Sequence, residues 1–494
     1  MKETLRGIGF VLHVPLLMAL VSLGVCAAFG EWYGAGGFLL TGLASLLPGQ
    51  LLIYLTRDAE PLKLRHALYI SASAWLLVCL LCSIPFMWTA FEHPLAATAV
   101  FKQFSNALFE SISGITSTGL SVLVDVESLP RHLQWWRSLT EWVGGIGLVV
   151  LLLTVLPITR SALDLYQSEG RDQKLYPTVR STVKAIWLLF LLFTALGTGG
   201  LLLAGEPPWQ ALNHAMAAIS TGGFSITNDS IGSSSTAAKI VYLPIMIVGA
   251  MSFMVHYQLL TAGNWRAWLW KTAEIKAFWA IMLGGALLLT FENRLSPTPI
   301  AVIDSVFLWV SAATTTGFAT TGIAAWPHVS IVLLILVMLV GAMAGSTGSG
   351  IKVLRLVILL KGFVWSLRLS NRSPRQIVRF DWNGANLDSG QAGKMVRQAT
   401  LLAVAYLLLW LLCSLMLLHA LPPETLLQDA FFEIASAQAN VGLSVGITSA
   451  ELSGLGKTAL CIAMYVGRLE LVPAMALLVA VLQSITGRVA PRKR

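Results

Sequence analysis

Charged side chains are scarce in this chain of 494 residues, where Asp, Glu, Lys and Arg make up 12% and hydrophobic residues 56%. An ordinary soluble domain carries about twice that charged fraction, so the composition excludes a protein that hides its apolar surface from water by folding alone. Windows of about 20 residues with few or no charges recur along the chain, and each suits a helix that crosses a bilayer. The sequence therefore predicts an integral membrane protein.

Cysteine is also scarce, and all five cysteines lie in apolar segments: Cys26, Cys79, Cys82, Cys413 and Cys461. This placement argues against a disulfide framework. Cys79 and Cys82 form a CxxC pair, but no second pair or nearby histidine accompanies it, which argues against a metal or redox centre. No Ser/His/Asp or Cys/His arrangement supports an enzyme. We therefore expect no enzymatic activity and no organic cofactor in this chain.

Most basic residues lie in the connections between apolar segments, so the net charge of +9 indicates membrane topology and not a nucleic-acid partner. Ten spans are expected, near residues 8–29, 36–55, 67–90, 133–158, 183–204, 240–260, 275–291, 329–364, 396–418 and 455–485. Alternate connections are rich in Lys and Arg, and the others nearly lack them. The positive-inside rule then places both termini in the cytoplasm, which requires an even number of spans.

One pattern occurs four times, always in a connection that the charge rule puts outside the membrane. Each copy is a semi-apolar stretch of about a dozen residues, too short to span, which ends in small and hydroxyl residues and then Gly plus Leu or Phe. Aligning the copies on their last glycine gives Gly119, Gly223, Gly317 and Gly442. The spacing between these glycines leaves room for two spanning helices and their loops.

A short helix that enters the membrane and stops must return as extended chain, which is stable only around water or ions. Four such turns around one axis would place carbonyl oxygens where they replace the hydration shell of a cation. The four helix C-termini would add partial negative charge. The competing interpretation is close helix packing through small residues, but packing motifs need not follow the topology as these four copies do. A cation-coupled secondary transporter is the alternative function, although such proteins usually carry paired interruptions in two inverted halves.

The four turns, together with RSLTEWVGGIGLVVLLLTVLP from Arg137, GAMAGSTGSGIKVLR from Gly341 and MYVGRLELVP from Met464, resemble the TrkH/TrkG family of bacterial potassium-uptake proteins. This family belongs to a superfamily with KtrB and the plant HKT transporters, and the resemblance covers nearly the whole chain. It implies an all-α polytopic membrane protein with four helix–pore helix–filter–helix repeats around one central pore. The expected divisions are two extra helices in 1–60 and repeats in 61–160, 161–263, 264–392 and 393–494.

The resemblance also implies a potassium-translocating subunit of the bacterial inner membrane that forms a homodimer and is gated by a cytosolic TrkA-like nucleotide-binding subunit. Carried over by position, the filter consists of Thr116, Ser117, Thr118 and Gly119; Ser220, Thr221, Gly222 and Gly223; Thr314, Thr315, Thr316 and Gly317; and Ala439, Asn440, Val441 and Gly442. Asn440 and Val441 depart from the Thr-rich pattern, which argues against exact fourfold symmetry. In the superfamily a Ser at the first-repeat glycine is associated with sodium selectivity, so Gly119 favours potassium.

Residues 341–352 interrupt an apolar run, and Gly345, Gly348 and Gly350 break helical propensity there. A break at membrane depth is expected to line a cavity, and the resemblance implies a gate loop below the filter that includes Lys352. The stretch also imitates a phosphate-binding loop, but it lacks the Gly-Lys pair and the flanking strand that this motif needs. Arg468 lies inside the last expected span, where a charge is costly. The resemblance implies an electrostatic barrier under the filter, and the alternative is a snorkelling or paired residue.

Four residues stand nine positions before the aligned glycines: Glu110, His214, Leu308 and Glu433. The two acids allow two interpretations that the sequence leaves open. They supply negative field for a cation, or they accept hydrogen bonds that tie the short helices to their neighbours.

Overall fold

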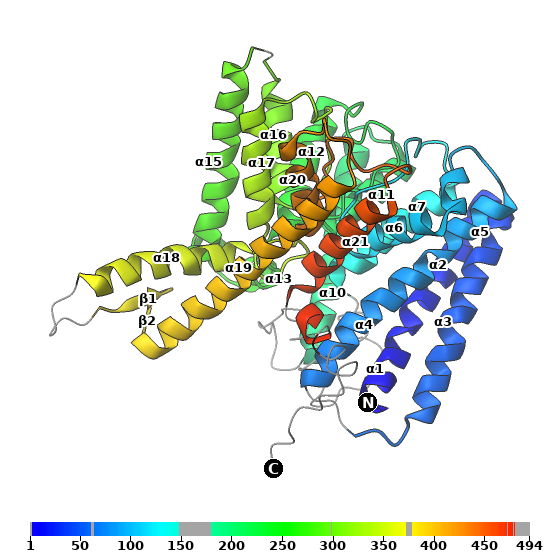
Figure 1. The fold of residues 1–494 in the computed structure, drawn as a ribbon, viewed down its shortest axis with the longest axis horizontal. Coiled ribbons are helices and arrows are strands. Elements are labelled where there is room, and N and C mark those ends of the chain that lie inside the picture. Colours follow the sequence, from blue (N-terminus) through cyan, green and yellow to red (C-terminus); the bar gives the residue numbers. More distant parts are fainter. Residues whose placement is uncertain are drawn as a thin grey trace.

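The computed structural model describes residues 2–60, 64–147, 179–297, 299–371, 378–471, 473–477 and 479. Helices form most of this part of the chain, and strands form very little of it (Figure 1). Six stretches are helical, long and apolar enough to cross a membrane: Lys2–Phe29, Trp32–Leu55, His66–Glu92, Ser181–Leu203, Ala273–Leu295 and Ser389–His419. They match six of the ten expected spans, and the all-α polytopic fold class is confirmed.

These stretches contain both single helices and joined helices. The joined ones are α1 (Lys2–Val11) with α2 (His13–Phe29), η1 (Trp32–Gly34) with α3 (Ala35–Leu55), and α4 (Leu64–Cys82) with α5 (Ile84–Glu92). The single ones are α10 (Val179–Leu203), α15 (Ala273–Leu295) and α19 (Ser389–His419). Many of their leucines are exposed, as expected for helices that face lipid. The first two stretches pack together on one side of the molecule, against α4, α5 and α7 (Figure 1).

The sixth expected span, residues 240–260, is not one continuous helix. It consists of α12 (Thr236–Ala250) and α13 (Phe253–Thr261), which are bent by 104°. The bend frees carbonyl groups at the end of α12, and a distant segment satisfies them, since the Met343 N–H donates to the Ala250 oxygen at 3.1 Å. A break inside a membrane is stable only when such partners are supplied.

Three other expected spans are also interrupted or only partly described. The run 329–364 is broken as predicted, into α17 (His328–Val340) and α18 (Val353–Ser370). The fourth and tenth spans begin as α7 (Arg131–Ile146) and α21 (Gly454–Leu469), and much of their predicted remainder lies outside the described residues. Short helical turns η2 (Ala99–Lys102) and α14 (Trp265–Trp268) complete the connections.

Four short helices of 12 residues each lie at the centre: α6 (Phe104–Ile115), α11 (Pro208–Ile219), α16 (Val302–Ala313) and α20 (Leu427–Gln438). Each contacts the long helix before it and the helix after it. Each also contacts the helix that follows another short helix: α11 with α7, α16 with α12, α20 with α17, and α6 with α21. The last of these contacts closes the four short helices into a ring.

A two-stranded hairpin lies at the far end of α18 and α19, away from this ring (Figure 1). Strands β1 (Phe380–Trp382) and β2 (Ala385–Leu387) are antiparallel. Asn383 and Gly384 join them with φ values of 51° and 87°, as a two-residue hairpin turn requires. The Asn383 side chain accepts a hydrogen bond from the Ala273 N–H at 2.9 Å, so the hairpin is attached to the start of α15.

Candidate functional site

The four turns that follow the short helices share one hydrogen-bond pattern. In the first turn, the Ser117 N–H donates to the Gly114 oxygen and the Thr118 N–H to the Ser113 oxygen, both at 2.8 Å. The same two bonds end α11, α16 and α20, as in a Schellman cap. The residue that reverses the chain has a positive φ in every turn: Ser117 at 50°, Thr221 at 54°, Thr315 at 57° and Asn440 at 52°. Left-handed backbone is uncommon for such residues, and Asn440 adopts it like the others despite its departure from the Thr-rich pattern.

The aligned glycines bring the four turns into one closed ring. Their φ values are 87° at Gly119, 83° at Gly223, 89° at Gly317 and 94° at Gly442. A Cβ atom at each glycine would overlap a carbonyl oxygen of the next turn. The overlapped oxygen belongs to Gly222 for Gly119, to Thr316 for Gly223, to Val441 for Gly317 and to Thr118 for Gly442. Because the fourth contact returns to the first turn, the structure places all four sequence-predicted turns around one axis.

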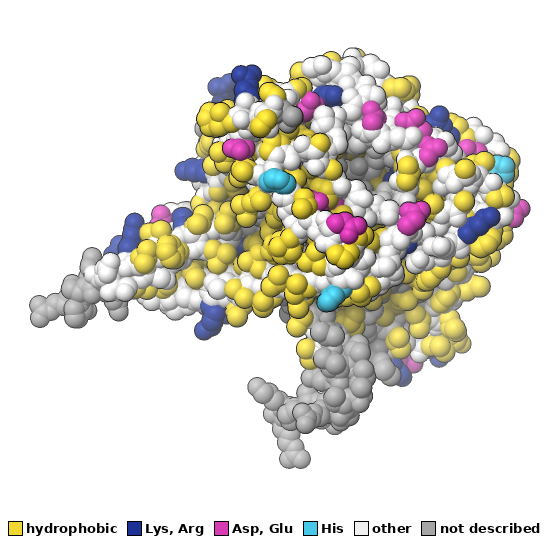
Figure 2. Space-filling view, turned by 45° about the horizontal axis from the view of Figure 1, so that its top comes forward, with side chains coloured by type: hydrophobic (Ala, Val, Ile, Leu, Met, Phe, Trp, Pro, Cys, Tyr) yellow, Lys and Arg dark blue, Asp and Glu magenta, His cyan; other side chains and the backbone are white. Residues whose placement is uncertain are grey.

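A wide cavity, which we call the vestibule, opens onto one side of the ring. All four aligned glycines line it, and so do polar residues that follow each turn: Ser121, Ser225, Thr320 and Ser444. Figure 2 shows the corresponding face of the molecule, with acidic side chains around its hollowed centre. Its rim is held by Asn228, whose side-chain oxygen accepts a hydrogen bond from the Val126 N–H at 2.7 Å.

Polar side chains on three of the short helices tie each helix to the strand-like segment that follows its turn. Glu110 accepts from the Val122 N–H at 3.2 Å, and Glu433 accepts from the Val445 N–H at 3.1 Å. His214 occupies the same place in the second repeat, where its Nε2 accepts from Ile226 N–H at 3.2 Å. These hydrogen bonds agree with the interpretation that Glu110 and Glu433 act as acceptors, and the interpretation that they supply negative field stays a prediction.

Two buried ionisable residues of α7, Arg137 and Glu141, belong to the site although we did not select them from the sequence. Arg137 donates to Glu110 at 2.8 Å, and its guanidinium lies 4.0 Å from the centre of the Phe224 ring. The Glu141 carboxylate accepts from the Phe224 N–H at 3.0 Å, and the Glu141 carbonyl accepts from the Ser117 hydroxyl at 2.7 Å. Ionisable residues within an apolar segment are the signal that would have identified them.

The loop 341–352, which we call the gate loop, lies against the second and third turns of the ring. The Ser349 N–H donates to Thr315 Oγ1 at 3.2 Å, and Thr347 Oγ1 donates to the carbonyl of Ile219, the last residue of α11, at 3.1 Å. Thr221 Oγ1 donates to Thr347 Oγ1 at 3.3 Å. The predicted break in the apolar run therefore lies next to the ring. It contacts the ring where the turns leave the short helices.

Further hydrogen bonds hold the gate loop from its other sides. Lys352, whose partner the sequence did not name, donates from Nζ to the Gly348 oxygen. The Ala344 N–H donates at 2.7 Å to Glu274, a buried residue in the first turn of α15 that we also did not select from the sequence. The Phe253 N–H, at the start of α13, donates to the Gly345 oxygen at 3.1 Å. The loop is thus an ordered element with partners on several helices.

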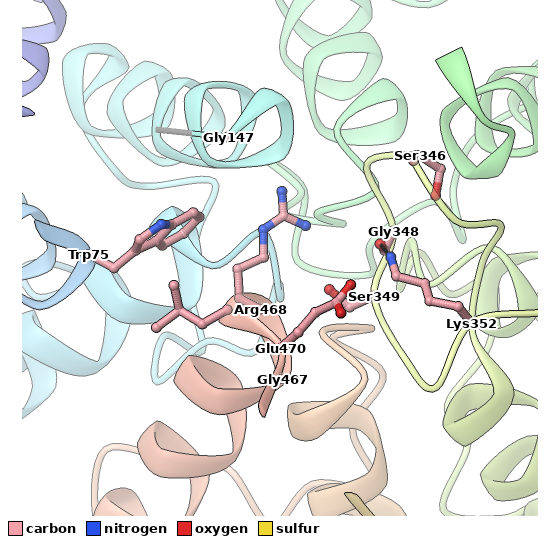
Figure 3. Close-up of a pocket in the computed structure, with 11 residues that line it drawn as sticks. Trp75, Gly147, Ser346, Gly348, Ser349, Lys352, Gly467, Arg468 and Glu470 are labelled. Carbon is pink, nitrogen blue, oxygen red and sulfur yellow. Dashed lines mark hydrogen bonds between the residues drawn. The ribbon is translucent and has the colours of Figure 1, made fainter. Parts of the chain in front are cut away.

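Arg468 reaches across a small pocket beside the gate loop (Figure 3). Its guanidinium donates to the Thr347 oxygen of the loop and to the Gly144 and Gly145 oxygens at the end of α7. The pocket is also lined by Trp75, Gly345, Gly348, Ser349 and Lys352. Arg468 therefore connects α21 with the gate loop and α7.

Glu470 is the acid nearest to Arg468 in the sequence, but its carboxylate pairs with another residue. Its partner is Arg355 of α18, at 2.5 Å. The partners of Arg468 described above are carbonyl oxygens, so its positive charge is solvated by backbone dipoles.

Comparison with known proteins agrees with this architecture. The model of the TrkH family, described as a cation transport protein, matches residues 36–485. The chain belongs to the TrkH family. It is accordingly a multi-pass cation transport protein and not an enzyme, and the resemblance drawn from the motifs is confirmed.

Two relatives in sequence and one solved structure each match most of the chain. The Trk system potassium uptake protein TrkH of Escherichia coli K12 is 32% identical over 375 residues, which are 71% of this chain and 76% of that protein. An uncharacterized cation transporter of Methanocaldococcus jannaschii is 32% identical over 446 residues, 89% of this chain and 87% of that one. The crystal structure of the potassium transporter TrkH from Vibrio parahaemolyticus superposes with a TM-score of 0.82 at 28% identity, covering 97% of this chain and 98% of that chain.

Proposed function

We propose that this protein carries potassium across a bacterial inner membrane through the ring of four turns. The observation that supports the proposal most directly is the closed ring, in which a glycine of each turn faces a carbonyl oxygen of the next. Carbonyl rings of this kind replace the hydration shell of a monovalent cation. The names of the Escherichia coli and Vibrio parahaemolyticus relatives, which are potassium transporters, agree with this choice of ion.

In this proposal the ion passes from the vestibule through the ring to the pocket beside the gate loop. The binding residues are those of the four turns, 116–119, 220–223, 314–317 and 439–442. The repeats span residues 61–160, 161–263, 264–392 and 393–494, after two extra helices in 1–60. K⁺ is the transported substrate, and the pathway needs no organic cofactor.

The gate loop closes this pathway next to the ring. Its hydrogen bonds to Thr221 and Thr315 place it across the ends of two turns. Gly345, Gly348 and Gly350 give the loop the backbone freedom to move, and Lys352 and Arg468 hold it in the closed position. The positive charge of Arg468 also opposes cations that reach the pocket.

The assembly that we propose is a homodimer regulated by a cytosolic TrkA-like nucleotide-binding subunit, with both termini of the chain in the cytoplasm. The basic connections of the sequence support this orientation. The hairpin β1–β2 then lies on the cytoplasmic side, where its attachment to the start of α15 gives a partner access to the helix that carries Glu274.

Ion flux from purified protein in liposomes tests the proposal. Under outward gradients of potassium, rubidium or sodium, we expect potassium and rubidium to move and sodium to move far more slowly. The flux should not depend on an imposed proton gradient. Flux that requires a proton or sodium gradient would favour the cation-coupled secondary transporter, and the absence of potassium flux in folded protein would reject a potassium pathway.

A further inference from the structure

Glu141 lies directly behind the second turn of the ring. Its side chain is fully buried, and its two carboxylate oxygens lie 3.0 and 3.1 Å from the Phe224 nitrogen, whose N–H they accept. A Cβ atom at Gly222 would overlap the Glu141 carboxyl group, so only glycine lets the turn approach so closely. A carboxylate on α7 therefore contacts the backbone of a turn that belongs to the next repeat.

Glu141 forms no ion pair with a basic side chain in the part of the chain that the structure describes. Arg137, one helical turn earlier, is the buried base of this region, and it pairs with Glu110 at 2.8 Å. Arg137 also donates to the Ser225 oxygen at 2.7 Å. Among the ion pairs of the described residues, none includes Glu141. Of the two acids, one carboxyl group is thus left without a paired base beside the ring, and a buried charge without a counter-charge is unfavourable.

Packing alone does not require an acid at this position. Three glycines pack in the same way against the last residue of a short helix. A Cβ atom at each glycine would overlap or crowd the carbonyl oxygen of that residue: Ile115 for Gly144, Ile219 for Gly249 and Gln438 for Gly467. Three residues before each of these glycines stand Glu141, Met246 and Met464. The correspondence extends to the backbone, because the Glu141 carbonyl accepts from Ser117 and the Met464 carbonyl accepts from Asn440. The chain thus fills two of these places with methionine.

We propose that Glu141 determines the cation affinity of the ring, and this inference rests on the proposed potassium pathway. Its carboxylate fixes the second turn through Phe224 and supplies a negative charge that a cation in the ring balances. Because Arg137 pairs with Glu110, the cation supplies the positive charge that balances Glu141. A fixed charge in a site shielded from water attracts an ion more strongly than the same charge in water.

Glu141→Gln tests the charge because glutamine keeps an oxygen that can accept from Phe224. We expect its half-saturating potassium concentration, measured by flux in liposomes and by potassium-dependent thermal stabilisation in detergent, to rise about tenfold, equivalent to about 1.4 kcal/mol. Glu141→Met, which copies Met246 and Met464, should raise it at least as much. Glu141→Asp keeps the charge and should lose less affinity than Glu141→Met. The matched control is Asp304→Asn, which removes one negative charge at the start of α16, at the opposite end of that helix from its turn.

A half-saturating concentration within twofold of the wild type in Glu141→Gln would overturn the inference and leave Glu141 a structural hydrogen-bond acceptor. If Glu141→Gln does not fold, equal potassium affinities in Glu141→Asp and Glu141→Met would also overturn the inference. The proposed pathway is judged separately. Wild-type protein without potassium flux would reject it, whereas wild-type flux with unaltered Glu141 variants would reject only the role of Glu141.

Discussion

Replacing Gly119 with serine perturbs two turns of the ring at once. Gly119 has a φ of 87°, and a Cβ atom there would overlap the Gly222 oxygen of the second turn. Left-handed backbone costs an L-residue about 1–2 kcal/mol, and the overlap adds a displacement of the Gly222 carbonyl. The backbone cost alone corresponds to a change of roughly five- to thirtyfold in an equilibrium constant.

We expect this strain to appear as lost discrimination between ions, because carbonyl positions set the preference for potassium. The potassium-to-sodium flux ratio of Gly119→Ser in liposomes should fall about tenfold or more. Gly205→Ser is the matched control, since Gly205 has a similar φ of 92° but a Cβ atom there has no neighbour within 4 Å. The control should fold with comparable strain and keep the wild-type ratio.

A Gly119→Ser protein that is folded, inserted and unchanged in its potassium-to-sodium ratio would contradict the assignment of Gly119 to the filter. A Gly205→Ser protein with an equal loss of selectivity would show that backbone strain anywhere in the chain produces the effect.

The remaining predictions concern the gate loop, and their main measurement is the basal potassium flux without a cytosolic partner. Arg468→Ala should reach the membrane at near-normal levels and conduct faster, because the loop loses its link to α7 and the pocket loses a positive charge; unaltered flux would contradict both roles. Deleting Gly345 and Gly348 should raise basal flux and weaken control by a partner, and zero flux in inserted protein would argue against a gate. Glu274→Ala leaves the Ala344 N–H without its acceptor, which costs about 1–3 kcal/mol, and should raise basal flux more than Glu274→Gln. Equal flux in these two variants and the wild type would show that this hydrogen bond does not hold the loop.

The repeated pattern was sufficient to predict the four turns, because each contains its own helix, cap and glycine within about twenty residues. Local sequence determines such a cap, and the structure reproduces it even at Asn440, where the residue types differ. The interruption at 341–352 was also predictable, since Gly345, Gly348 and Gly350 mark it in the sequence. These features depend on contacts between residues that are near in the chain.

The break between α12 and α13 was not predictable in the same way. No glycine or proline stands at Met251 or Ser252, where the chain turns by 104°. The partners that stabilise the break come from the gate loop, about ninety residues later, and include the Thr347 N–H, which donates to the Gly249 oxygen at 3.3 Å. Contacts over such distances are invisible to periodicity and propensity.

The same limit applies to the charged residues of the site. The sequence identified Arg468 as a costly charge but did not name its partners, which include the carbonyl oxygens of Thr347, Gly144 and Gly145. Glu141 lies within a quoted motif, yet its contact with Phe224 joins two repeats 83 positions apart. Predicting these partners requires knowledge of how the repeats are arranged around the ring.

The residues at the four reversal points of the ring are anchored unequally. Ser117 and Asn440 donate to the main chains of α7 and α21, whereas Thr221 and Thr315 bond to the gate loop. A displacement of the loop would therefore release two adjacent turns while the other two stay fastened to helices. If the loop is the gate that we propose, opening would distort the ring on one side only, and the same atoms would then both admit ions and recognise them. A protein built this way is expected to discriminate between ions differently when it is partly open than when it is fully open.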